Sequence, residues 1–378
     1  MEAQERLFSL DLLRGLDMFL LRAVVPLVFA GNQIWHFSPG FMRQFHHPWG
    51  GFTLLDFIMP LFIFMCGAAV PLALPKRMED GRAGLKYWKH VASRVALLWI
   101  LGMVCQGNLL TLDVSKFALY TNTLQAIASG YVIAAVALAI RNVRVRQILP
   151  FAFVAVYAGL LACCGDYSKE GNYAYVFELK LETALPFIGN TLGGHYTWFL
   201  TTLMFGAMTL AGAASTEVLL DQRWSARRRT GVLFLAGVGL VVLGGALIPV
   251  VPAIKHIYTA SFTAIAVGCS MMLYAALYYV YDVCSFRRCM ALPMLFGQCA
   301  LAAYMVNNVF YGLLDTVGET VALKTGRILV EDLPFYRSLI HAVLLVLVVL
   351  AWKNFKSMSK IPRSDVAERK PLSNNSEG

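Results

Sequence analysis

The chain reads HHPWGGFTLLDFIMPLF at residues 46–62, where ionisable side chains run directly into a long apolar segment. His46, His47 and Trp49 precede the segment, and Asp56 lies about one turn inside it. A carboxylate inside an apolar membrane helix is costly and needs a specific partner. The stretch therefore predicts the start of a membrane-spanning helix and the most concentrated chemistry in the chain.

The composition predicts an all-α integral membrane protein. Hydrophobic residues make up 58% of the 378 residues and charged residues only 14%, with a mean hydropathy of +0.62. A soluble domain carries about a quarter charged residues. The formal net charge is +10, but most Lys and Arg fall in short loops between apolar segments. This distribution is typical of membrane topology, so we expect a lipid bilayer as a partner and no nucleic acid.

Apolar length predicts about ten transmembrane helices. A hydrocarbon core about 30 Å thick needs about 20 apolar residues per helix. The expected spans cover residues 14–31, 53–75, 88–107, 117–140, 147–164, 196–215, 229–251, 258–281, 290–314 and 335–352. Because ten is even, both termini are expected on one side. The first apolar segment follows a charged stretch and is expected to stay as a membrane anchor rather than a cleaved signal peptide.

The basic residues predict which side that is. Loops that follow even-numbered spans are rich in arginine, for example Arg141, Arg144 and Arg146 after the fourth span. Such loops are cytoplasmic, which makes both termini cytoplasmic and places His46 and His47 on the outer face. We expect a bacterial inner membrane, a transmembrane domain at residues 1–352, a basic disordered tail at 353–378, and a short loop helix at 174–186.

Metal and disulfide frameworks are not expected, because the eight cysteines are scattered and none forms a C-x-x-C pair. An N-terminal cluster offers different chemistry. Asp11, Arg14 and Asp17 are spaced three apart and share one helix face. They are either an ion-pair cluster that anchors the first helix or a socket for the phosphates of a nucleotide-like cofactor.

The remaining polar residues each allow a structural and a functional interpretation. A histidine can act as a general base near neutral pH, and Gly50-Gly51 lets the chain fold tightly beside His46 and His47. Lys255 is either a snorkelling lysine or a ligand-binding one. Amides in apolar helices must be satisfied by neighbouring helices or by a ligand; they are Gln125, Asn307 and Asn308.

Several motifs together carry a family resemblance. They are SLDLLRG at 9–15, the His46-x-x-Trp49-x-Gly51-x-Thr53-x-x-Asp56-x-x-x-Pro60-x-Phe62 pattern, LQAIASGY at 124–131, KHIYTASF at 255–262, and GQCALAAY at 297–304. In this order they resemble the transmembrane region of the heparan-α-glucosaminide N-acetyltransferase family and its bacterial relatives. The resemblance covers residues 7 to about 350. We expect no counterpart of the large lumenal domain of the animal enzyme, and Ala126 stands where the family usually has Arg.

The resemblance implies transfer of an acetyl group from cytosolic acetyl-CoA to the amine of a terminal glucosamine across the membrane. The family's active-site histidine lies three residues before the Trp, which is His46 here. With Asp56 it forms the expected catalytic set. Acetyl-CoA, the expected co-substrate, is assigned Asp11, Arg14, Gln125 and Lys255. The sugar acceptor is assigned His47, Trp49, Asn307 and Asn308. Whether His46 accepts the acetyl group or acts as general base stays open, and a homodimer is possible.

A second class of function fits the same charges. A secondary transporter for an amino sugar or another saccharide would use Asp56, Arg22 and His46 as midplane or gating charges. The chain has no convincing internal repeat, which argues against the common transporter architecture. A third interpretation is transfer of another acyl group, or transfer to a cell-envelope glycan.

Overall fold

A computed structural model of the chain describes residues 7–79, 81–105, 119–185, 196–286, 291–305, 320 and 333–358. Within these ranges every regular element is a helix, and the only extended pairing is a single bridge between Glu79 and Arg82. The predicted all-α class is confirmed for this part of the chain. Asn307 and Asn308 lie outside the described residues.

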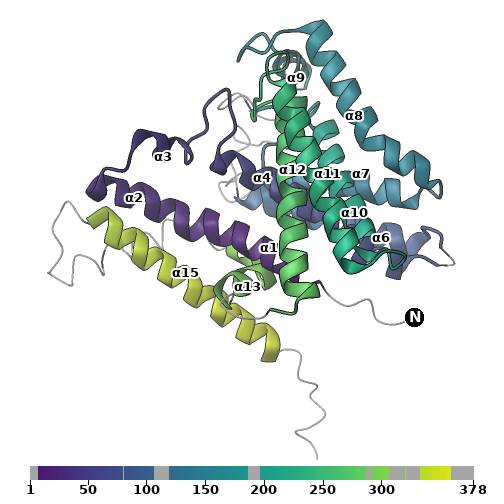
Figure 1. Cartoon of the computed structure of the whole chain (residues 1–378). Helices are drawn as coiled ribbons and strands as arrows, with labels where there is room; N and C mark the ends of the chain where they lie inside the picture. The colour runs from purple at the N-terminus through teal and green to yellow at the C-terminus, as the bar shows by residue number, and fades with distance from the viewer. Residues whose placement is uncertain are drawn as a thin grey trace, which may run out of the picture.

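Figure 1 shows the arrangement of the described helices. They are α1 (Phe8–Phe19), a π-helical segment (Leu20–Val24), α2 (Val25–Trp35), α3 (Pro39–Arg43), α4 (Leu54–Ala68), α5 (Val70–Ala73), α6 (Leu85–Cys105), α7 (Thr123–Ala139), α8 (Val143–Cys164), α9 (Tyr173–Ala184), α10 (Thr202–Leu220), α11 (Ala226–Leu247), α12 (Ala260–Leu277) with a second π-helical segment (Tyr278–Val283), α13 (Ala291–Gln298) and α15 (Leu333–Met358). Helix α9 confirms the expected short loop helix.

Seven helical segments of the described chain are long and apolar enough to cross a membrane. The chain is therefore an integral membrane protein. The full count of ten spans and the side of the termini stay predictions. Helix α7 is apolar but shorter than the seven, α1 and α2 together cover the first predicted span, and the ninth predicted span is described only in part. Helix α15 ends at Met358, inside the predicted tail.

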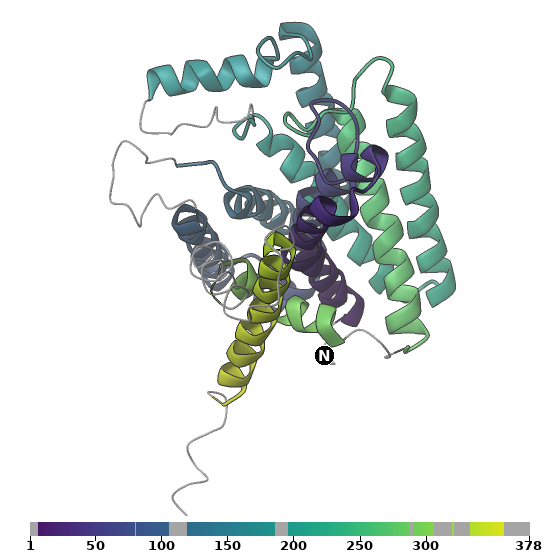
Figure 2. The same cartoon turned by 90° about the vertical axis from the view of Figure 1, so that its left-hand side faces the viewer.

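The bundle has a buried centre and an exposed outer layer. The spans that contain α4, α10 and α12 are 61–67% buried, whereas those of α6, α8, α11 and α15 are only 11–22% buried. Figures 1 and 2 show α11 lying along α12, and α15 lying along α2. The outer helices present apolar side chains outward, for example Phe151 of α8 and Val242 of α11. This pattern fits a protein whose surrounding solvent is hydrocarbon.

Glycines let the helix backbones touch where the bundle is tightest. A methyl group at Gly67 of α4 would overlap the carbonyl of Thr209, and one at Gly212 of α10 would overlap the carbonyl of Phe64. Helices in lipid associate through such small residues because lipid leaves no hydrophobic drive between them. The α4–α10 contact fixes the helix that carries Asp56.

The α11–α12 contact gives a matched test of this packing. A Cβ atom at Gly237 of α11 would lie 2.7 Å from the carbonyl oxygen of Gly268, whereas nothing lies within 4 Å of a Cβ at Gly239 on the same helix. We expect Gly237→Leu to destabilise the fold by about 1–3 kcal/mol through overpacking, and Gly239→Leu to change it little. Thermal unfolding in detergent measures both. Equal shifts in the two variants would contradict the close α11–α12 contact.

The loop that carries the histidine motif and the arginine-rich loops lie at opposite ends of the helices. The segments that precede α4 and α10 meet the α11–α12 loop at one end, as shown by the hydrogen bonds from Gly51 N to Ala253 O and from Thr197 N to His256 O. The α8–α9 loop joins them there through the hydrogen bond from Trp49 Nε1 to Tyr167 O. The arginine-rich α7–α8 and α10–α11 loops follow the opposite ends of their helices. The histidine motif and the basic loops thus lie at opposite ends of the bundle.

Candidate functional site

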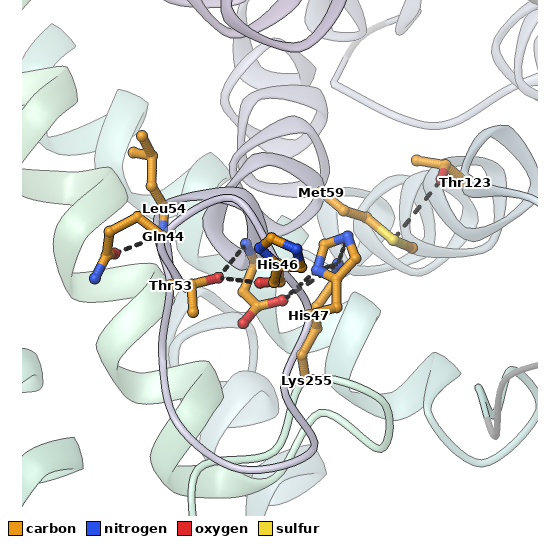
Figure 3. Close-up of polar contacts among 9 residues, drawn as sticks. Gln44, His46, His47, Thr53, Leu54, Met59, Thr123 and Lys255 are labelled. Atoms are coloured by element: carbon orange, nitrogen blue, oxygen red, sulfur yellow. Dashed lines mark hydrogen bonds and ion pairs between the residues drawn. The ribbon is translucent and has the colours of Figure 1, made fainter. Parts of the chain in front are cut away.

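The histidine motif folds back onto the first turn of α4. Thr53 is the N-cap residue of α4, and its Oγ1 accepts a hydrogen bond from Asp56 N at 3.2 Å while donating to His46 O at 3.0 Å. Gln44 Oε1 accepts from Leu54 N at 3.2 Å. Gly51 has φ of +116°, which favours glycine at this turn. These contacts place both histidines above the N-terminus of α4 (Figure 3).

Asp56 joins His47 and Lys255 into one ionic cluster, in which the His47 side chain is 35% exposed. Its Oδ1 lies 2.6 Å from His47 Nδ1 and 3.5 Å from Lys255 Nζ. The Asp56 side chain is fully buried, and that of Lys255 is only 6% exposed. Lys255 Nζ also lies 3.0 Å from His47 Nδ1. Asp56 sits in the first turn of α4, where the helix dipole favours a negative charge.

A tight turn between α11 and α12 carries Lys255 into this cluster. Thr259 Oγ1 donates to Pro252 O at 2.8 Å and accepts from Ile254 N at 3.0 Å. Tyr258 adopts a left-handed conformation with φ of 46°, which costs free energy for a residue with a bulky side chain. The turn therefore keeps a strained backbone to hold Lys255 beside Asp56.

Burial changes the acidity of the two ionisable residues in this turn. Removal from water lowers the pKa of Lys255 to about 8, although the Asp56 carboxylate opposes the shift. Burial, followed by the charge of Lys255, lowers the pKa of His256 to about 4. At neutral pH Lys255 is a cation close to its titration point, and His256 is neutral. Lysines whose pKa is lowered in this way are candidates for functional sites.

His46 is oriented by a different partner. Its Nδ1 lies 2.8 Å from the carbonyl oxygen of Met42, and because a carbonyl only accepts, Nδ1 carries the proton. The lone pair of the neutral ring is then on Nε2. The ring also makes an edge-to-face contact with Phe29 at 5.4 Å between centroids. The His46 side chain is exposed, so its basic nitrogen is open to an incoming group.

Aromatic rings form one wall of the site. His256 stacks on Trp49 with ring centroids 5.1 Å apart and lies 4.3 Å from the ring centroid of Tyr196. Trp49 Nε1 donates to the carbonyl oxygen of Tyr167 at 3.0 Å. The wall thereby joins the α3–α4, α8–α9, α9–α10 and α11–α12 connections. His256 and Tyr196 were not predicted as site residues. They lie on two loops that are distant in the sequence, and no local sequence pattern indicates that these loops meet.

Glu178 fixes the connection that carries Tyr196. Its Oε1 accepts hydrogen bonds from Phe199 N at 2.9 Å and from Trp198 N, and its Oε2 has no hydrogen-bond partner among the described residues. Burial raises the pKa of Glu178 to about 7. Glu178 was not predicted as a site residue, because its partners are backbone groups that sequence does not reveal.

The N-terminal cluster lies elsewhere in the bundle. Arg14 Nη1 lies 3.5 Å from Asp11 Oδ1, which confirms that these two residues share a face. Asp17 is buried, and its Oδ2 has no hydrogen-bond partner within the described part of the chain. Arg14 and Arg94 both lie close enough to Cys66 for an electrostatic interaction. Cys66 is ten residues beyond Asp56 on α4, about 15 Å along the helix axis.

The predicted acetyl-CoA residues therefore separate into three places. Lys255 lies in the ionic cluster beside the histidines. Asp11 and Arg14 form a separate ion pair on α1, and Gln125 caps α7. The Gln125 side chain accepts from Thr121 N at 2.8 Å and from Asn122 N at 3.0 Å, and donates to Leu119 O at 2.7 Å. These contacts occupy its amide with backbone groups. No group of metal-binding side chains occurs among the residues that the structure covers.

Comparisons with known proteins agree with the motif resemblance. The model of a domain of unknown function, DUF5009, matches residues 6–135. Heparan-alpha-glucosaminide N-acetyltransferase of Mus musculus is 28% identical over 106 residues, which cover 27% of this chain and 15% of the mouse protein. The Homo sapiens protein of the same name is 27% identical over 99 residues, which cover 26% of this chain and 13% of the human protein.

The family resemblance inferred from the motifs is thus confirmed as a distant similarity, and it supports an acyltransferase type of function. The matches cover a small part of each relative. The DUF5009 match includes Asp11, Arg14 and the histidine motif but ends before Lys255. The partner that completes the ionic cluster therefore lies beyond the matched domain.

Proposed function

We propose that this protein transfers an acetyl group from acetyl-CoA to the amine of an amino sugar. The observation that carries the proposal is the arrangement of an open imidazole nitrogen on His46 beside the Asp56–His47–Lys255 cluster, whose carboxylate and ammonium are buried. Acyl transfer needs a base for the amine and a positive group where negative charge develops on the acyl oxygen. The similarity to N-acetyltransferases supports the same reaction class.

Each group has a role in the proposed chemistry. His46 Nε2 takes the proton of the amine as the amine nitrogen attacks the thioester carbonyl. The new C–N bond forms, the C–S bond breaks, and the proton passes to the CoA thiolate. The Lys255 ammonium stabilises the oxyanion of the tetrahedral intermediate. A covalent route would instead place the acetyl group on His46 Nε2 before the amine attacks.

The donor would enter from the opposite end of the bundle. Arg14 and Arg94 are cations close to Cys66, which lies near the C-terminal end of α4, about 15 Å from Asp56 along the helix axis. Arginine suits the phosphates of acetyl-CoA because its planar fork binds them bidentately. The acetyl-bearing arm would then extend along α4 toward His46. This arrangement supports entry of the donor from the side of the basic loops, the expected cytoplasmic side of a bacterial inner membrane.

The acceptor would bind at the loop end. Trp49 and Tyr196 pack on His256 at the same end of the bundle as His46 and His47, and an aromatic wall with polar edges suits the apolar face and hydroxyls of a sugar ring. Purified protein in detergent, given acetyl-CoA and glucosamine, is expected to release CoA and acetylate the amine in equal amounts. Movement of unmodified sugar across a liposome membrane without CoA release would indicate a transporter instead.

The pKa of Lys255 leads to a prediction for the pH profile. Because the folded-state pKa is about 8, the ammonium is present below that pH and is lost above it. We expect kcat/KM for acetyl transfer to fall as pH rises through about 8. The arginine of Lys255→Arg keeps its charge over this pH range. In this variant we therefore expect no fall of kcat/KM as pH rises through about 8. A fall that is unchanged in Lys255→Arg would exclude Lys255 as the titrating group.

A further inference from the structure

A membrane-facing groove follows one side of the bundle, distinct from the histidine site. Helices α7, α8, α10, α11 and α12 line a cavity of about 490 Å³ whose walls are almost entirely apolar. Ala214 of α10 and Ala236 of α11 line it with small side chains, and Phe151 and Leu243 stand exposed at its borders. Figure 1 shows α8 as the outer helix on this side.

The groove is long enough for an extended hydrocarbon chain. Its α11 lining runs from Val232 to Leu247, about 22 Å at the rise of an α-helix. One leaflet of a hydrocarbon core about 30 Å thick measures about 15 Å. The lining therefore continues past the midplane, farther than a single leaflet.

One end of the groove is polar and basic. There it meets a second hollow of about 630 Å³, and Leu138, Arg146 and Glu217 line both. Arg141 and Arg223 also line this hollow. Arg223 is neutralised by Asp221 at 2.7 Å, whereas Arg146 makes a single contact of 3.4 Å with Glu217.

Arg146 stands at the junction of the two hollows. Its Nε is buried and has no hydrogen-bond partner in the described chain. A buried donor without an acceptor is costly, and an acceptor supplied by a ligand removes that cost. The lining of the second hollow carries three arginines and two carboxylates, which leaves a net positive mouth at the end of an apolar groove. This combination matches a molecule with a negative head and a hydrocarbon tail.

We propose that the groove binds a membrane lipid with a phosphate headgroup, which places the phosphate against Arg146 and Arg141 and one hydrocarbon chain between α8 and α11. Arginine binds phosphate through charge-assisted hydrogen bonds, and basic pockets between membrane helices select anionic lipids. The proposal does not depend on the acetyltransferase assignment, because none of its residues belongs to the histidine site.

Native mass spectrometry of the full chain in detergent tests the headgroup contact. Phosphatidylglycerol and phosphatidylcholine with identical acyl chains are added in equal amounts. We expect the wild-type chain to retain about fivefold more phosphatidylglycerol than phosphatidylcholine. Arg146→Gln is expected to abolish the preference and Arg146→Lys to keep it. Arg144→Gln is the matched control, because Arg144 is exposed on the same turn and lines neither hollow.

A second pair of variants tests the groove itself. The Ala236→Trp side chain would fill the cavity, so this variant is expected to retain less of both lipids. Val242 lies on the same helix but does not line the cavity, so Val242→Trp is expected to leave retention unchanged. Equal retention of the two lipids by the wild-type chain, or an Arg146→Gln variant that keeps the wild-type preference, would overturn the proposal.

Discussion

Replacing His46 with alanine is expected to lower acetyl transfer by about 10²- to 10⁴-fold, the usual contribution of a general base. The hydrogen bond from Nδ1 to Met42 O leaves Nε2 as the reactive nitrogen, and an alanine supplies neither base nor acyl acceptor. CoA release and N-acetylglucosamine formation by purified protein measure the loss. The fold should be unaffected, because the side chain is exposed.

The controls for this prediction separate His46 from its neighbour. His90→Ala, on α6, is expected to keep wild-type activity. His47→Ala removes the partner of Asp56 and is expected to lower activity. If the reaction follows the covalent route, His46 of this variant still accepts the acetyl group. Exchange of label between CoA and acetyl-CoA without sugar would indicate the covalent route. Full activity in His46→Ala together with none in His47→Ala would exchange the roles of the two histidines.

Replacing Asp56 with alanine is expected to cost about 3–5 kcal/mol of stability below pH 8, because it leaves the Lys255 ammonium buried without its carboxylate. The Lys255 side chain is only 6% exposed, so water cannot replace Asp56. The variant is also expected to lose activity, since His47 and Lys255 both depend on this carboxylate for their positions. Thermal unfolding in detergent at pH 7 measures the first effect.

A double variant separates stability from function. Asp56→Ala with Lys255→Met removes both charges and is expected to recover most of the lost stability, because no charge is then left buried alone. It should remain inactive. A single variant that unfolds at the wild-type temperature, or a double variant no more stable than the single, would show that the Asp56–Lys255 contact does not hold the site together.

Local patterns predicted the parts of this molecule that depend on a few neighbouring residues. Apolar length predicted the helices, and the spacing of Asp11 and Arg14 predicted their contact. The carboxylate at Asp56 was expected to need a partner, but its partners lie on different elements: His47 precedes the helix, and Lys255 comes from a turn some two hundred residues later. Long-range pairing of this kind is set by how helices pack, which a single sequence does not show.

Residues with several possible roles were harder to assign. Gln125 was grouped with acetyl-CoA, yet its amide caps α7 through the backbone of residues 119–122. A glutamine three residues after an Asn N-cap is a local capping signal, so this role was available from the sequence. The stacking of His256 on Trp49 and Tyr196 required three separate loops to converge, and no local pattern indicates that.

Acetyl transfer across a sealed membrane tests the central claim most directly. Protein is reconstituted in liposomes with glucosamine inside and acetyl-labelled acetyl-CoA outside, and the lumenal sugar is analysed for label. Labelled N-acetylglucosamine is expected inside for chains whose basic loops face outward, matched by CoA released outside, and neither product is expected with His46→Ala. Sugar that leaves the liposomes unmodified while acetyl-CoA stays intact would contradict the central claim.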